Sequence, residues 1–102
     1  MKAKVFLLVV IAISTLILQA LASDRFQIVV HENNGNYAYN AFVEVLDGDT
    51  RVDSGYTDNN GAFYTWLDRS TRYKITARGN GQNGDYQGFP ESDDIHIYMR
   101  YP

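Results

Sequence analysis

The chain has 102 residues and a formal net charge of −3, and its length is that of one small domain. It contains no cysteine, so a disulfide framework is excluded. The acidic balance argues against nucleic acid and anionic membrane surfaces as partners, since both attract basic proteins.

Residues 1–22 have the pattern of a secretory signal peptide. Two lysines start it, residues 5–18 form an apolar run, and residues 20–22 are a small-residue cleavage site. We predict cleavage after Ala22. Cleavage leaves a single domain over residues 23–102 with a net charge of −5, since two of the nine basic residues are lost, and places it outside the cell or in a bacterial periplasm. The alternative, an uncleaved membrane anchor, is disfavoured because a spanning helix needs roughly 20 apolar residues.

The remaining sequence predicts an all-β fold, because short runs of alternating apolar and polar residues follow one another without helical periodicity. In chain order, the predicted strands cover residues 26–31, 41–46, 52–57, 63–67, 73–77 and 95–99. The residues expected to face the core are Phe26, Ile28, Val30, Ala41, Val43, Val45, Phe63, Thr65, Leu67, Tyr73, Ile75, Ala77, Ile95, Ile97 and Met99.

Turn chemistry marks the junctions between these strands. Residues 33–36 (N-N-G-N) and 47–49 (D-G-D) are predicted turns, because glycine and asparagine tolerate positive φ angles. In residues 57–63 (T-D-N-N-G-A-F), Asp58 is expected to accept hydrogen bonds from backbone amides further along the turn, and the Asn-Gly pair supplies left-handed geometry. We expect this motif to set strand register and to deliver its phenylalanine to the core.

Residues 79–94 contain four glycines and one proline, without regular alternation. They are predicted to form the longest loop of the chain. Loops of this length in compact domains are often functional, and Tyr86 and Phe89 offer contact area beside Arg78. The alternative is a crossover segment with no role in binding.

Residues 40–45 read N-A-F-V-E-V, residues 57–63 read T-D-N-N-G-A-F, and residues 73–77 read Y-K-I-T-A. These segments resemble two strands and a turn of the prealbumin-like, or transthyretin-like, family, best known as the regulatory-like domain attached to carboxypeptidases. The resemblance spans about residues 26–99 and implies a small Greek-key β-sandwich of about seven strands. It also implies a binding, accessory or structural role. Residues 68–72 replace the family's usual Pro-Gly pair.

Two histidines fall on the outward phase of predicted strands. If the strands of His31 and His96 are neighbours, the rings approach one another and, with Glu32 or Asp94, could bind a divalent cation. A metal site needs three or four converging ligands, so we expect solvent-facing histidines and neither a metal nor a cofactor.

Three carboxylates, from Asp47, Asp49 and Asp53, surround one predicted turn, and calcium binding there is left open. The EF-hand spacing is not met, since its sixth position requires glycine and Val52 stands there. An acidic turn on the surface is the simpler interpretation.

The sequence contains no recognised catalytic motif. It lacks a nucleophile elbow, a phosphate-binding glycine loop and a cysteine nucleophile. The hydroxyisourate hydrolases related to the prealbumin-like family end in Tyr-Arg-Gly-Ser, whereas residues 98–102 read Y-M-R-Y-P. We therefore predict a protein that is not an enzyme.

Aromatic side chains on the outward phase of the strands are the main candidates for a binding site. Rings on a flat sheet face can stack on sugars or anchor a protein partner. The predicted binding residues are Phe42, Tyr64, Trp66, His96, Tyr98 and Arg100, together with Tyr86 and Phe89 from residues 79–94. The alternative is that both sides of these strands are covered, or that the rings are present because they favour β-structure.

We therefore expect a secreted, non-enzymatic binding module for a protein or carbohydrate partner, acting through the aromatic face or through residues 79–94. One alternative is a secreted effector or protein inhibitor that presents residues 79–94 to its target. A second is an enzyme of the hydroxyisourate hydrolase type. We also expect a homo-oligomer, because a small core without disulfides lies beside an apolar second face.

Overall fold

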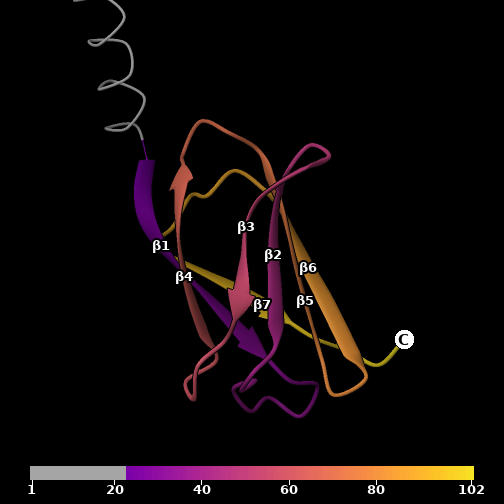
Figure 1. The fold of residues 1–102 in the computed structure, drawn as a ribbon. Helices are drawn as coiled ribbons and strands as arrows, with labels where there is room; N and C mark the ends of the chain where they lie inside the picture. Colours follow the sequence, from indigo (N-terminus) through magenta and orange to yellow (C-terminus); the bar gives the residue numbers. More distant parts are fainter. Residues whose placement is uncertain (1–22) are drawn as a thin grey trace, which may run out of the picture.

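The computed structural model describes residues 23–102, and the predicted signal peptide lies outside them. The described part consists of seven β-strands and contains no helix (Figure 1). In chain order the strands are β1 (Ser23–His31), β2 (Phe42–Asp47), β3 (Thr50–Tyr56), β4 (Ala62–Asp68), β5 (Tyr73–Gly79), β6 (Gln82–Gly88) and β7 (Asp94–Tyr98). No helix that could cross a membrane is therefore found in this part of the chain.

The strands form two sheets, which confirms the predicted all-β sandwich. The three-stranded sheet has the order β4-β1-β7, and the four-stranded sheet has the order β3-β2-β5-β6. β1 runs antiparallel to β4 and parallel to β7, whereas every pair in the four-stranded sheet is antiparallel. Only β2–β3 and β5–β6 are hairpins, so each of the other connections carries the chain from one sheet to the other.

The core lies between the sheets and contains the residues that the alternating pattern predicts. All of them are buried except Phe63, which is partly buried and packs against the core. Phe63 also explains a glycine in the facing sheet, because a Cβ at Gly55 would lie 2.5 Å from the Phe63 ring. Successive side chains of a strand point to opposite sides, so the same alternation places the remaining side chains on the outer surfaces of the sandwich.

The turn between β3 and β4 has the predicted chemistry. Asp58 Oδ1 accepts hydrogen bonds from the amides of Asn60 (2.9 Å) and Ala62 (3.0 Å). Gly61 has a φ of 71°, and a Cβ there would lie 2.6 Å from the carbonyl oxygen of Val30. The motif is therefore a structural turn in which glycine is needed for its backbone angle and for its close approach to β1.

Thr57, at the start of this turn, joins two of the four connections that link the sheets, the β1–β2 and β3–β4 segments. Its side chain is buried; Oγ1 donates a hydrogen bond to the carbonyl of Ala38 and accepts one of 2.9 Å from the amide of Ala41. Ala38 and Ala41 lie in the segment between β1 and β2. Thr57 therefore supports the path of the chain into both sheets.

The prediction that residues 79–94 form a long loop is wrong, because Gln82–Gly88 is a strand paired with β5. Asn80 and Gly81, with φ angles of 52° and 74°, form the tight turn between the two strands. A Cβ at Gly84 would lie 2.9 Å from the carbonyl oxygen of Tyr98, so glycine stands where an apolar side chain would mark a strand. With Gln82 and Gly88 at two other inward positions of β6, this glycine leaves the strand without the usual apolar alternation.

Candidate functional site

The candidate site lies on the solvent-facing side of the three-stranded sheet, which we call the outer face. Strand register decides which side chains are neighbours across it. From one end of the sheet to the other, Arg25 lies opposite Trp66, Gln27 between Tyr64 and Asp94, Val29 between Ala62 and His96, and His31 opposite Tyr98. Tyr64 and Trp66 therefore occupy one end of the outer face, and the two histidines with Tyr98 occupy the other.

Four of the predicted binding residues come together on the outer face. Trp66 and Tyr64 occupy alternate positions of β4 and are 67% and 47% exposed, while Tyr98 on β7 is 61% exposed. His96, also exposed, lies near Tyr98 at the other end of this face from Trp66 and Tyr64. The aliphatic residues of the same face, Val29 and Ala62, are buried, so the rings stand out from a surface that offers little other apolar area.

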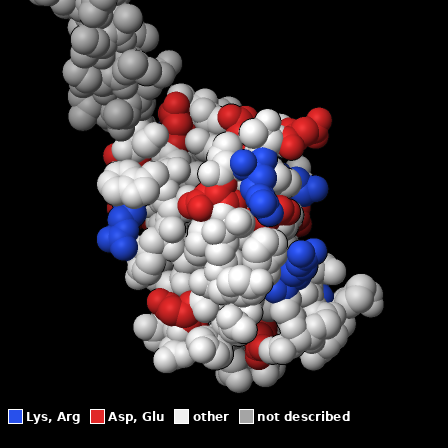
Figure 2. Space-filling model, viewed as in Figure 1, with Lys and Arg blue, Asp and Glu red and all other residues white. Residues whose placement is uncertain are grey.

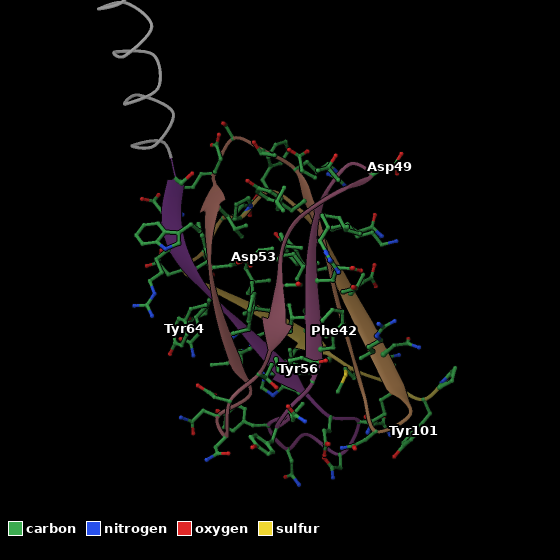
Figure 3. All side chains as sticks on the ribbon, in the orientation of Figure 1. Phe42, Asp49, Asp53, Tyr56, Tyr64 and Tyr101 are labelled. Carbon is green, nitrogen blue, oxygen red and sulfur yellow. The ribbon has the colours of Figure 1, made fainter. Side chains whose placement is uncertain are left out.

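Phe42 is not part of the outer face, because it belongs to β2 in the other sheet. It packs against Tyr56 with ring centroids 5.3 Å apart, and the Arg78 guanidinium lies 5.0 Å from its ring centroid. Figure 3 shows Phe42 and Tyr56 on the four-stranded sheet, well away from Tyr64 on β4. Together with Asn40 and Asn83 these residues line an open cavity of about 470 Å³.

Tyr86 and Phe89, the two rings predicted within residues 79–94, interact with each other. Tyr86 is partly buried on the inner side of β6 and packs against the core. Its hydroxyl donates a hydrogen bond to the carbonyl of Phe89, whose own ring is 45% exposed. Arg100 is exposed and follows β7, where its backbone pairs with that of Asn83. Tyr86, Phe89 and Arg100 are therefore not among the cross-strand neighbours that make up the outer face.

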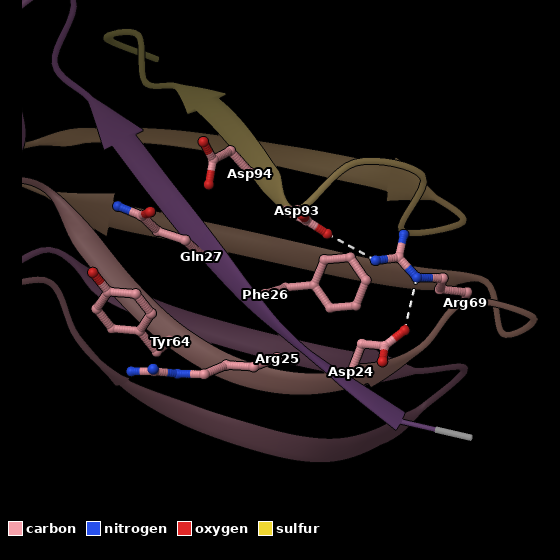
Figure 4. Close-up of a pocket in the computed structure, with 8 residues that line it drawn as sticks. All are labelled: Asp24, Arg25, Phe26, Gln27, Tyr64, Arg69, Asp93 and Asp94. Carbon is pink, nitrogen blue, oxygen red and sulfur yellow. Dashed lines mark hydrogen bonds and ion pairs between the residues drawn. The ribbon is translucent and has the colours of Figure 1, made fainter. Parts of the chain in front are cut away.

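An open cavity of about 430 Å³ lies beside Tyr64 at one end of the outer face. Arg25 stacks on the Tyr64 ring, with its guanidinium carbon 4.3 Å from the ring centroid. Gln27, Asp24, Asp93 and Asp94 add amide and carboxylate groups to the lining (Figure 4). An aromatic ring thus adjoins hydrogen-bond donors and acceptors in one depression of the surface.

Arg69 organises the acidic side of this cavity. Its Nε lies 2.8 Å from Asp24 Oδ2 and its Nη2 lies 2.8 Å from Asp93 Oδ1 (Figure 4). These two carboxylates raise the pKa of the Arg69 guanidinium above its ordinary value. The guanidinium also lies 4.7 Å from the centroid of the Phe26 ring. Through its ion pairs with Asp24 and Asp93, Arg69 links the start of β1 to the segment just before β7.

Sequence reasoning missed Arg25 and Arg69 as members of the site. Arg25 precedes the first predicted core residue, and only its register opposite Trp66 places it on the outer face. Arg69 lies in residues 68–72, where the chain departs from the prealbumin-like pattern, and that departure was the one available signal. Over the surface seen in Figure 2, acidic and basic side chains are interspersed, without an extended patch of one sign.

The two histidines meet at the other end of the outer face, as expected if their strands are neighbours. His31 Nε2 lies 2.9 Å from His96 Nδ1. His31 also stacks on Tyr98, with ring centroids 4.5 Å apart and planes inclined by 12°, and its centroid lies 5.3 Å from that of Tyr37. Burial lowers the pKa of His31 below its ordinary value and the neighbouring His96 lowers it further, while a backbone hydrogen bond with Gly35 acts in the opposite direction.

Of the three carboxylates predicted around the β2–β3 turn, the Asp53 carboxylate accepts hydrogen bonds from other strand residues. Asp53 accepts hydrogen bonds from the Ser54 amide (2.8 Å) and from Thr65 Oγ1 (2.7 Å), whereas Asp47 and Asp49 are exposed. Among residues 23–102, no group of three or more His, Cys, Asp or Glu side chains is arranged to hold a metal ion. Asp53 therefore serves as a structural link between β3 and β4.

A comparison of the chain with models of known protein families finds no match, and neither does a comparison with curated proteins. The structure defines an all-β, two-sheet sandwich. The outer face, with its exposed rings and adjoining polar cavity, is therefore the candidate binding surface.

Proposed function

We propose that the chain is a secreted, non-enzymatic binding module of the prealbumin-like type, and that one end of its outer face recognises a carbohydrate. The observation that supports this most directly is the pairing of two exposed rings, Trp66 and Tyr64, with the polar cavity beside Tyr64. The rings point to the same side of β4, because they occupy alternate positions of one strand.

The chemistry of this end suits a sugar. The C–H face of a pyranose packs on an aromatic ring, while its hydroxyl groups both donate and accept hydrogen bonds. Arg25 and Gln27 supply donors, and Asp24 and Asp94 supply carboxylate acceptors, all lining the same cavity as Tyr64. Arg69 holds Asp24 at 2.8 Å, so this acceptor is already oriented before a ligand arrives.

A protein partner fits the same surface less well. A standard protein interface covers about 800 Å² on each side and has a continuous apolar centre. The aliphatic side chains of the outer face, Val29 and Ala62, are buried, and the exposed rings stand among charged and amide groups. An inhibitor that inserts residues 79–94 into a target is not proposed, because most of that segment is a paired strand.

Intrinsic fluorescence offers a direct test, since Trp66 is the only tryptophan of the chain. A panel of neutral oligosaccharides is titrated into the purified protein, and a change in Trp66 emission identifies a ligand, whose affinity is then measured by calorimetry. We expect Trp66→Ala and Tyr64→Ala each to weaken that affinity about tenfold or more, which corresponds to the loss of one stacked ring.

The matched control is Tyr56→Ala, which removes a ring that is 63% exposed on the other sheet. Its sugar affinity should stay within twofold of the starting protein. Equal losses in all three variants would reject the outer face as the site. Binding to a protein partner that depends on Trp66, without binding to any glycan in the panel, would reject carbohydrate as the ligand class.

A further inference from the structure

The histidine pair lies at the end of the outer face away from the proposed sugar site. His31 and His96 are the only histidines of the chain and are 65 residues apart in sequence. The parallel pairing of β1 with β7 places them diagonally across neighbouring strands, with ring nitrogens 2.9 Å apart. His96 is exposed, so this edge of the pair is open to solvent.

We infer that His31 and His96 form a two-histidine binding site for a first-row transition-metal cation, with Cu²⁺ as the preferred ion. The spacing of the nitrogens supports this assignment. Two imidazole nitrogens bound to one ion at about 2.0–2.1 Å lie roughly 2.9 Å apart when the bond angle is 90°, and about 3.4 Å apart at the tetrahedral angle. In the ion-free pair this 2.9 Å contact is a hydrogen bond between the two rings, and the same spacing fits adjacent positions of a square-planar or tetragonal ion that takes the place of the shared proton.

The ligand type and number favour Cu²⁺ over Zn²⁺. Imidazole suits both ions, but Cu²⁺ binds most tightly in the divalent series and takes tetragonal geometry, whereas protein-bound Zn²⁺ is usually held by three or four protein ligands in a tetrahedron. Among the described residues no third His, Asp or Glu completes such a set, and the Glu32 carboxylate instead accepts a hydrogen bond from Asn80 Nδ2. The remaining positions of the ion are left to water or a small external ligand.

The neighbouring rings hold the pair in place before an ion binds. His31 is stacked on Tyr98 at 4.5 Å and lies against Tyr37 at 5.3 Å, so its ring orientation is restrained from two directions. Each neutral imidazole has one N–H group. When the ion binds, each N–H is located on the ring nitrogen away from the ion, and Nε2 of His31 and Nδ1 of His96 both offer lone pairs.

Copper titration of the protein purified without a histidine tag, from cells that express the full chain, tests this inference. We expect one Cu²⁺ per chain, with electron paramagnetic resonance showing tetragonal copper coupled to imidazole nitrogen. His96→Gln and His31→Asn should each weaken Cu²⁺ binding at least tenfold, while Zn²⁺ binds the starting protein at least tenfold more weakly than Cu²⁺.

Asp94→Asn is the matched control, since it removes the carboxylate two residues before His96 and should change Cu²⁺ affinity less than twofold. Circular dichroism establishes that each variant is folded, and His96→Gln, at an exposed position, keeps the test available if His31→Asn does not fold. Unchanged copper affinity in His96→Gln, or copper bound without an imidazole nitrogen signal, would overturn the inference. So would the absence of saturable binding.

Discussion

The outer surfaces of the two sheets repeat one motif in different surroundings. On the three-stranded sheet Arg25 lies 4.3 Å above Tyr64, and on the four-stranded sheet Arg78 lies 5.0 Å above Phe42. The first pair adjoins carboxylates that Arg69 holds in place, whereas the second adjoins Tyr56 and amide side chains. An arginine stacked on a ring therefore does not define a ligand by itself. The polar groups around it decide which ligand fits.

The largest expected effect is a loss of stability at Thr57, whose hydrogen bonds hold the chain where it passes between the two sheets. Thr57→Val removes the buried hydroxyl that bonds Ala38 and Ala41 and leaves both backbone groups without that partner. The free energy of unfolding should fall by about 2–3 kcal/mol, as measured by urea denaturation. Thr50→Val, at an exposed position of β3, is the control and should change stability by less than about 0.5 kcal/mol. Similar values for the two variants would remove Thr57 as the common support.

A paired substitution separates the two ring–arginine motifs. Arg25→Ala should weaken the sugar affinity about fivefold to tenfold, because it removes both a stacked cation and a donor from the cavity. Arg78→Ala removes the same kind of stack from the other sheet and should leave the affinity within twofold. Calorimetric titration with the sugar identified by fluorescence measures both. An equal loss in the two variants would show that the surfaces do not differ in function.

The smallest effect is a pH dependence that belongs to the outer face alone, since both histidines lie there. His31 has a lowered pKa in the folded chain, so the unfolded chain binds more protons at a pH between that value and about 6.5. The free energy of unfolding should therefore rise with pH across this window. The contribution of neutral His31 is lost as the pH falls below about 6.5. Thermal unfolding between pH 5 and pH 8, without added metal, measures this slope. A slope that stays unchanged in His31→Asn would assign it to other groups.

Alternation along the strands was enough to predict the all-β class and the strand residues that fill the space between the sheets, because a strand that covers a core must be apolar at every second position. It did not predict the burial of Val29 and Ala62 on the outer face. It could not assign strands to sheets. Phe42 and Tyr64 share the outward phase, yet they belong to opposite sheets, and only the pairing of β2 with β3 and β5 separates them.

Two further features depend on tertiary contacts that a pattern does not contain. Gly84 replaces the apolar residue that would have revealed β6, because the backbone of Tyr98 occupies the space of its side chain. The histidine pair required the parallel alignment of β1 with β7. From the sequence, the approach of the two rings could be predicted only on the condition that their strands are neighbours.

The topology also predicts an order of events during folding. The four-stranded sheet contains both hairpins, β2–β3 and β5–β6, whose contacts are local, whereas the three-stranded sheet is built entirely from strands that are distant in sequence. Local pairings form early, and distant ones incur the entropy of loop closure before they add stability. The outer face requires β7, the last strand of the chain, to pair with β1, so we expect the surface proposed to bind sugar and copper to form late in folding. Binding through this surface is therefore expected to report a chain in which β1 and β7 have paired.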